Sequence, residues 1–356
     1  MKDALICLAA GKVQKIIIEK AVNLGIVVIA VDKNKHAPGF AYSTEAIYVS
    51  TYESTEIIEA LELFAEKYNF IGVINRSSGI PVITSSVISE YFNIPGLPVT
   101  SAQTIVYKDK LREFCCKHQI PTPSFFIPKK QIPEDFKKIA FPVVVKPALS
   151  LHGKSGISIA NSKKELESSI EYAMSNSMTG NTIIEEYLSG ADLTLIGVVN
   201  NGEYCPICLL EEINSLKKNV VSAVGYKTHH VDNHNWMSQA VKISRKVVSI
   251  LEISRSFFMS CFRSDENNKL RLIEIHLDLG GDLLIEKLLK NALHLEFVEF
   301  IIEFLFYGKR CPKSIKINPT LIIYRKGAGD LFDRGCDVYS AKSNNELNKL
   351  TEKKRL

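Results

Sequence analysis

Residues 1–98 alternate between short apolar runs and longer amphipathic runs, and this alternation is the strongest constraint on the fold. The apolar runs have strand length and lie at residues 4–8, 26–31, 47–50 and 70–75. The amphipathic runs have helical spacing and lie at residues 12–24, 57–68 and 87–91. Strands that alternate with helices predict a parallel sheet with right-handed crossovers, which is a Rossmann-like unit.

The first turn of this unit does not have the glycines of a dinucleotide site. Gly11 is followed by neither of the two further glycines that let a backbone approach a pyrophosphate. Asp32 ends the second strand, where a carboxylate that binds ribose would lie. One glycine and one aspartate predict a platform on the substrate side rather than an NAD site.

Composition and charge exclude several classes of protein. The 356 residues are 46% hydrophobic and 23% charged, which is typical of a soluble protein of two or three packed units. The net charge of +5 comes from 44 basic and 39 acidic residues that are spread along the chain, so we expect no nucleic-acid partner. No apolar run reaches transmembrane length, so we expect no membrane partner.

The eight cysteines lie in apolar surroundings, which predicts reduced thiols and a cytoplasmic location. Cys205 and Cys208 have the spacing of a redox or metal pair. No second pair completes a zinc site, so we predict a structural role for both.

The rest of the chain continues as mixed α and β structure after a turn-rich junction at residues 93–98. We predict helices at residues 102–118, 163–174, 236–251 and 295–306, and a helix from Gly280 through Asn291. We predict strands at residues 141–147, 157–160, 182–187, 193–199, 204–210, 257–263, 270–276 and 321–324. The residues after 324 are predicted as a polar tail.

Four segments carry groups that phosphoryl transfer needs, namely cations and backbone N–H donors for phosphates and hard oxygen ligands for a metal. Lys146 ends an apolar strand and is followed by the glycine loop 150–156. Residues 185–188 offer an extended backbone that adenine could pair with. Glu274 lies in an apolar strand, where an unpaired buried carboxylate would be costly.

These segments, at residues 107–112, 141–156, 183–192 and 272–282, resemble in order and spacing the ATP-grasp superfamily, in particular its carboxylate–amine ligases. The resemblance implies an α/β protein in which a Rossmann-like domain precedes two α+β subdomains that clasp ATP. It implies four units: residues 1–98, an N-terminal grasp subdomain with its lid at 99–188, a C-terminal grasp subdomain at 189–310, and an extension at 311–356.

The resemblance also implies roles for single residues. Lys110 and Lys146 would contact ATP phosphates, and Lys146 with Glu274 and Asp278 would be catalytic. The lid over the γ-phosphate would comprise His152, Gly153, Lys154, Ser155 and Gly156. The adenine would be held by Glu185, Glu186, Tyr187 and Leu188, and the ribose by Asp192. Glu274 and His276 would bind Mg²⁺.

The last segment departs from the family pattern of Glu-x-Asn-x-Arg. His276 replaces the asparagine and Asp278 replaces the arginine. The second metal carboxylate is expected near Ser260 or Phe262, and neither residue is acidic. Either His276, Asp278 and Asp282 rebuild the metal site for a different substrate, or the chain binds nucleotides with impaired catalysis.

The resemblance implies an ATP-dependent ligase that forms a carbon–nitrogen bond through an acylphosphate. Its substrates would be a small carboxylate and an amine, such as amino acids, with ATP and Mg²⁺ as cofactors. A carboxylase or carbamoyl-type enzyme is a further alternative. The sequence does not identify either substrate and leaves the oligomeric state open, although homodimers are common among such enzymes.

Overall fold

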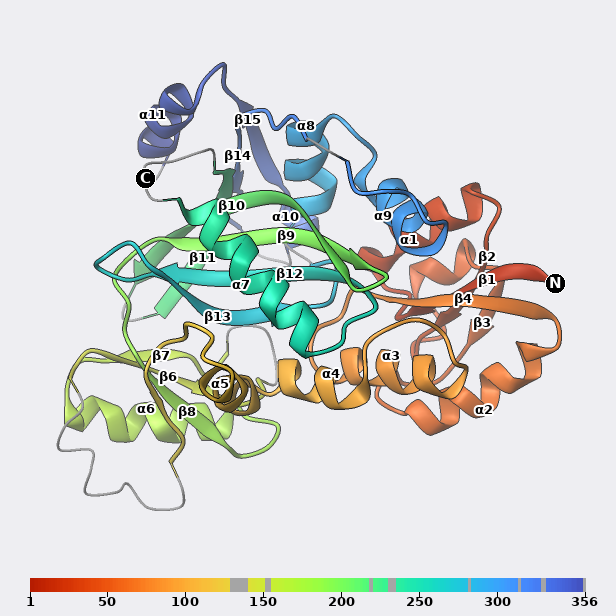
Figure 1. Cartoon of the computed structure of the whole chain (residues 1–356), viewed down its shortest axis with the longest axis horizontal. Helices are drawn as coiled ribbons and strands as arrows, with labels where there is room; N and C mark the ends of the chain where they lie inside the picture. Colours follow the sequence, from red (N-terminus) through yellow and green to blue (C-terminus); the bar gives the residue numbers. More distant parts are fainter. Residues whose placement is uncertain are drawn as a thin grey trace.

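The fold is that of a computed structural model, which describes residues 1–128, 140–150, 155–217, 220–229, 235–280, 283–312, 315–327 and 331–354. The described residues form three sheets (Figure 1), and helices cover them. Within the described part, no helix is both long and apolar enough to cross a membrane.

The N-terminal unit is a four-stranded parallel sheet, as predicted. Its strand order is β3-β2-β1-β4. The strands are β1 (Lys2–Leu8), β2 (Val27–Val31), β3 (Glu45–Ile47) and β4 (Tyr68–Asn75). The helices around them are α1 (Lys12–Asn23), the short 3₁₀ helix η1 (Pro38–Ala41), α2 (Ser54–Ala65) and α3 (Ile80–Tyr91). β2 is buried along its whole length, which explains its continuous apolar run.

Two helices follow where we predicted one helix at residues 102–118. They are α4 (Val99–Val106) and α5 (Lys108–Lys117). The prediction is wrong at Tyr107, whose backbone is extended. The next amide, of Lys108, donates to the carbonyl of Ala148 at 2.9 Å. This tertiary hydrogen bond ends one helix and sets the direction of the next.

The second sheet has four strands in the order β5-β8-β6-β7, and all its pairs are antiparallel. The strands are β5 (Phe125–Phe126), β6 (Val143–Pro147), β7 (Ser158–Ala160) and β8 (Thr182–Glu186). Helix α6 (Lys163–Ser175) packs against it, and the Ser162 hydroxyl caps the helix by accepting from the Glu165 amide. Predicted strand 182–187 and helix 163–174 are thus confirmed.

The third sheet has seven strands in the order β13-β12-β9-β10-β11-β14-β15, all antiparallel. The strands are β9 (Asp192–Asn200), β10 (Glu203–Lys217), β11 (Val220–Thr228), β12 (Arg255–Ser264), β13 (Leu270–His276), β14 (Thr320–Tyr324) and β15 (Cys336–Ser340). Helix α7 (Trp236–Ile250) covers one face (Figure 1), where Ser244 and Ser260 share a buried hydrogen bond of 2.7 Å.

The C-terminal segment is ordered structure, so the prediction of a polar tail is wrong. It contains α10 (Leu331–Arg334), β15 and α11 (Asn344–Lys354). Leu347 of α11 is buried with Leu321 of β14 and Ile213 of β10. A few buried apolar residues in polar surroundings are enough to dock this segment, and the sequence pattern did not reveal them.

The helix predicted from Gly280 is also placed differently. It begins as the π-helical turn η3 (Leu284–Leu289), continues as α8 (Lys290–Leu293), and is followed by α9 (Phe297–Phe306). One buried apolar cluster includes residues of α1, η3, α9 and the seven-stranded sheet. The N-terminal unit therefore shares a core with that sheet, and the four domain boundaries stay a prediction.

A disulfide joins Cys205 of β10 to Cys311, and their Cα atoms are 5.8 Å apart. The expectation that all eight cysteines are reduced is wrong for this pair. The fold brings together two residues that are 106 positions apart, which spacing in the sequence could not indicate. Cys208 is a buried free thiol, so Cys205 does not pair with it.

The contact between β11 and β14 leaves no room for a side chain at Gly225. A Cβ atom there would lie 2.1 Å from the Ile322 carbonyl oxygen. We expect Gly225→Ala to lower the free energy of unfolding by about 1–3 kcal/mol, because the strands must move apart. Exposed Ser222→Ala on the same strand is the control, and we expect it to leave the urea midpoint near the wild-type value. Equal midpoints for all three proteins would contradict this packing.

Candidate functional site

Three charged side chains are buried between the second and third sheets. Lys146 is the last residue but one of β6, Glu185 lies on the neighbouring strand β8, and Arg112 comes from α5. Glu185 Oε2 lies 2.8 Å from Lys146 Nζ, and its Oε1 accepts from Arg112 Nε at 2.8 Å. Their exposed fractions are 4% for Lys146, 3% for Glu185 and 0% for Arg112. One carboxylate thus holds two cations, which a buried charge requires.

Arg112 also connects the two sheets. Its Nη2 donates to the carbonyl of Ile273 on β13 at 2.6 Å. β13 is the edge strand of the seven-stranded sheet, and its next residue is Glu274. Through Arg112, the position of Glu185 in one sheet is therefore fixed relative to Glu274 in the other.

The charges of this group alter each other's pKa values. Burial lowers the pKa of Lys146 to about 8, although Glu185 opposes this shift and Arg112 and Lys108 add to it. Burial by itself would raise the pKa of Glu185, but Arg112 and Lys146 lower it below its ordinary value. Glu185 is therefore ionised at neutral pH, and the pKa of Lys146, at about 8, lies close to neutral pH.

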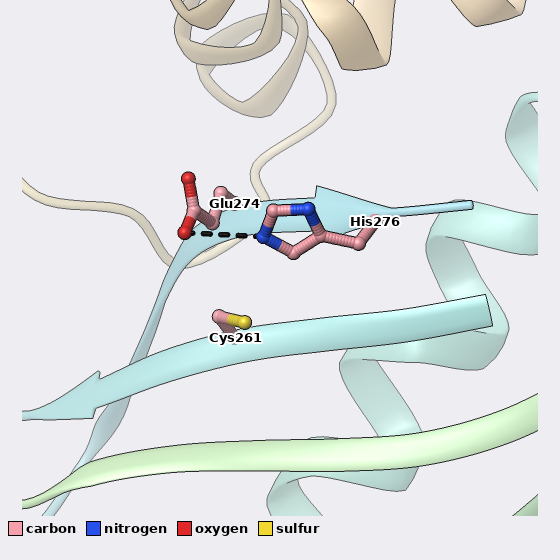
Figure 2. A group of neighbouring side chains, drawn as sticks. All are labelled: Cys261, Glu274 and His276. Carbon is pink, nitrogen blue, oxygen red and sulfur yellow. Dashed lines mark ion pairs between the residues drawn. The ribbon is translucent and has the colours of Figure 1, made fainter. Parts of the chain in front are cut away.

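A second group of side chains lies along β13, and Lys108 of α5 contacts it. Lys108 Nζ is 3.4 Å from Glu274 Oε2, and Glu274 Oε1 is 3.2 Å from His276 Nε2. The other imidazole nitrogen, Nδ1, is 3.7 Å from Asp278 Oδ2. Cys261 on β12 is the cross-strand partner of Glu274, and its thiol completes the group (Figure 2).

The pKa values in this second group reflect strong pairing. Burial opposes the charged form of His276, but Glu274 and Asp278 raise the pKa of the imidazole well above its ordinary value. Burial would raise the pKa of Glu274, but His276 and Lys108 lower it well below its ordinary value. Burial raises the pKa of the Cys261 thiol.

The two residues near which the second metal carboxylate was expected, Ser260 and Phe262, do not face Glu274. Ser260 is buried against α7, and Phe262 is buried in the apolar core on that side. Side chains alternate across a strand, so the residue between them, Cys261, faces Glu274. The sequence did not fix the pairing register of these two strands, and Cys261 was therefore not selected.

The residues expected to hold adenine and ribose lie together at the end of β8 and the start of β9. The Glu185 side chain contacts Lys146 and Arg112, so only its backbone is available to a base. Leu188 is buried, and Arg263 packs over the Tyr187 ring at 5.2 Å. Glu186 accepts from the Ser124 amide at 3.1 Å.

Asp192 is already engaged by other residues of the chain. It lies 3.1 Å from Arg263 Nε and accepts from Asn214 at 2.7 Å. A ribose contact would have to share this carboxylate with them.

The expected phosphate loop is described only at its C-terminal end. His152, Gly153 and Lys154 lie outside the described residues. Gly156 has a φ of +79°, and a Cβ atom there would lie 2.6 Å from Pro147, so the position requires glycine. The buried Ser155 hydroxyl has no hydrogen-bond partner in the described structure.

Comparison with known proteins finds ligases and synthetases with the same fold. The family described as "D-ala D-ala ligase C-terminus" matches residues 122–260. The L-amino acid ligase from Bacillus licheniformis has a similar fold, with a TM-score of 0.75 and 19% identity over 92% of this chain and 81% of that one. N5-carboxyaminoimidazole synthetase from Staphylococcus aureus, complexed with ADP, has a TM-score of 0.72 and 17% identity over 91% and 83%.

The chain therefore has the fold of these enzymes, and residues 122–260 are similar to the D-ala D-ala ligase C-terminal family. Curated relatives include formate-dependent phosphoribosylglycinamide formyltransferases. That of Bacteroides thetaiotaomicron is 27% identical over 75% of this chain and 68% of its own length. That of Bacillus velezensis is 25% identical over 56% and 53%. The chain thus matches between about half and two thirds of the length of these relatives.

Two cations of this buried group were not predicted from the sequence, and one predicted cation lies elsewhere. Lys108 and Arg112 contact the buried carboxylates. Lys110 is exposed, with its Nζ 4.8 Å from the Tyr107 ring centre, so its phosphate contact stays a prediction. Lys108 and Arg112 are about one helical turn apart, so both lie on the same side of α5. This spacing could have indicated them in the sequence.

The side chain of His229 is also engaged within the protein, because it contacts Glu211 and Trp236.

Loss of Arg112 should leave Glu185 incompletely paired in a buried place. We expect Arg112→Met to lower the free energy of unfolding by about 3–5 kcal/mol. Lys110→Met on the same helix removes an exposed charge and should leave this free energy near the wild-type value. Chemical denaturation compares the three proteins. A stable Arg112→Met protein would mean that the two sheets do not depend on this contact.

Proposed function

We propose that this protein is an ATP-dependent ligase that joins a small carboxylate to an amine. In the first step, a carboxylate oxygen attacks the γ-phosphorus of ATP, and ADP leaves. In the second step, the amine attacks the acyl carbon, and phosphate leaves as the amide forms and the amine loses a proton. The enzyme contributes mainly position and charge neutralisation to such a reaction.

The buried charges between the two sheets carry this proposal. Three cations, Lys108, Arg112 and Lys146, face two carboxylates, Glu185 and Glu274. The group has one surplus positive charge, and a low-dielectric site strengthens its attraction for phosphate. Lys146 is the cation that we expect to contact the phosphates of ATP, as the resemblance to ATP-grasp enzymes implies. The structurally similar proteins include a ligase and a synthetase, which supports the same reaction class.

The residues on β12 and β13 do not fit the expected Mg²⁺ site. Mg²⁺ requires oxygen ligands in octahedral geometry, whereas this group offers one thiol, one imidazole and one carboxylate. We therefore expect Mg²⁺ to arrive on the ATP phosphates with its waters, and we assign it no ligand from this chain. A cytoplasmic location and a homodimer stay predictions.

The resemblance implies a catalytic role for Asp278. It is 5% exposed, and its Oδ1 accepts from the Gly280 amide at 2.9 Å. Its other oxygen faces His276. We propose that Asp278 positions His276 and does not contact the substrate.

A substrate screen tests the proposed reaction. The purified full chain with ATP and Mg²⁺ is given pairs of small carboxylates and amines, and ADP release is measured. We expect release that requires both substrates. ATP that raises the melting temperature without turnover on any pair would indicate a nucleotide-binding protein instead. Release that requires only bicarbonate would indicate a carboxylase-type reaction, and both results contradict the ligase.

Lys146→Met should remove the phosphate-binding charge. We expect kcat/KM for the active pair to fall by about a hundredfold or more, because preorganised charge is lost from the transition state. Lys242→Met, an exposed lysine on α7, is the matched control and should retain wild-type kcat/KM. Equal losses in both variants, or in neither, would contradict the role of Lys146.

The pKa of Lys146 predicts how ATP affinity depends on pH. In the free protein, burial lowers the pKa of the Lys146 ammonium to about 8, Glu185 opposes this shift, and Arg112 and Lys108 add to it. Bound phosphate favours the ammonium and raises this pKa, so binding takes up a proton above pH 8. Affinity should therefore be constant below that pH and fall by up to about tenfold per pH unit above it.

Lys146→Arg provides the control, because a guanidinium keeps its charge throughout this range. Calorimetric titration with ATP from pH 7 to 9.5 measures both proteins. The wild type should lose affinity as the pH rises, and the variant should lose much less. Identical pH profiles would show that Lys146 does not titrate in the binding step.

A further inference from the structure

Cys261, Glu274 and His276 form a compact set of three donors on two neighbouring strands. Their ligand atoms all lie within 4.8 Å of one another. Glu274 and His276 are two residues apart on β13, so they share a face, and Cys261 faces them from β12 (Figure 2). A Glu274–His276 ion pair would explain two of these side chains, but not the thiol beside them.

Asp278 gives an independent sign that this set binds a ligand. It is 5% exposed, and its Oδ2 has no hydrogen-bond partner in the described structure. This oxygen lies 3.7 Å from His276 Nδ1. Imidazoles that bind a metal usually donate their other N–H to a carboxylate, which fixes the ring. With Nε2 facing Cys261 and Glu274, His276 has its Nδ1 on the side of such a carboxylate.

We propose that Cys261, Glu274 and His276 bind Zn²⁺. A thiolate, an imidazole and a carboxylate are ligands that zinc accepts, whereas a thiolate is a poor ligand for Mg²⁺. Three protein ligands leave the fourth tetrahedral position open, as in zinc sites that meet a substrate. That this open position meets the reactants rests on the proposed function, whereas binding of the metal does not.

The distances fit this metal with little rearrangement. Zinc bonds of about 2.0 Å in tetrahedral geometry place a carboxylate oxygen and an imidazole nitrogen about 3.3 Å apart. Glu274 Oε1 and His276 Nε2 are 3.2 Å apart. The thiol sulfur needs to approach these donors by at most about 1.3 Å, given Zn–S bonds of about 2.3 Å and ligand atoms within 4.8 Å of one another. Glu274 Oε2 remains directed at Lys108.

Metal titration without substrates tests the proposal. The full chain is stripped with a chelator, dialysed, and titrated with Zn²⁺ against a chromophoric chelator, and in parallel with Co²⁺. We expect one Zn²⁺ per chain. Co²⁺ should produce intense visible bands of tetrahedral geometry and a thiolate-to-cobalt charge-transfer band. A wild-type protein that binds no Zn²⁺, or gives no charge-transfer band, overturns the proposal.

Single substitutions locate the metal. Cys261→Ser should remove the charge-transfer band and weaken Zn²⁺ binding more than tenfold. Cys116→Ser, at an exposed free cysteine, is the matched control and should change neither. A band that persists in Cys261→Ser would place the metal elsewhere and overturn the proposal. Far-UV circular dichroism verifies that each variant is folded, and His276→Asn replaces Cys261→Ser if the latter does not fold.

Asp278→Asn tests the positioning role separately. We expect it to retain the charge-transfer band, because all three ligands remain, while Zn²⁺ affinity falls by about 10–100-fold. Unchanged Zn²⁺ affinity would show that Asp278 does not position His276 for the metal. The ligase and the zinc site can fail independently. Zinc binding without turnover on any substrate pair would support the zinc site and contradict the ligase. Full turnover by a protein that binds no zinc would support the ligase and contradict the zinc site.

Discussion

Glu185 is buried between two sheets and holds Lys146 and Arg112 at 2.8 Å each. The rest of the site depends on this arrangement, because Arg112 also binds the backbone of β13 beside Glu274. Lys146, which we expect to bind phosphate, and the residues on β13 thus come from different sheets, and Arg112 of α5 joins them in one fixed frame. Removing any member would leave a charge buried without compensation, which costs several kcal/mol. Structural and functional constraints coincide at these residues.

Much of the fold could be predicted from the sequence, because it rests on strong local patterns. The apolar run of β2 and the helical spacing of α1 define the parallel unit without tertiary information. Lys146 and Glu274 could be selected because charged residues in apolar strands need partners. The C-terminal segment could not be predicted, since Leu347 and Leu321 become buried only when distant elements meet.

The details of the site depend on geometry that the sequence does not contain. Cys261 was missed because a shift of one residue in strand pairing decides which side chains face Glu274. Arg112 was missed because a helix that breaks at Tyr107 turns it inward, while Lys110 remains outside. The departures at His276 and Asp278 were visible in the sequence, but only the structure shows that Asp278 faces His276. The cations that we propose for binding ATP thus lie beside a set of donors that suits a softer metal.

Transfer of oxygen from the carboxylate to phosphate tests the central claim most directly. The carboxylate substrate from the active pair is labelled with ¹⁸O in both oxygens, and the released phosphate is analysed by mass spectrometry. An acylphosphate leaves one carboxylate oxygen on phosphorus, so each phosphate should carry one ¹⁸O atom. Phosphate without the label would mean that the carboxylate does not attack ATP, and would contradict the proposed ligase mechanism.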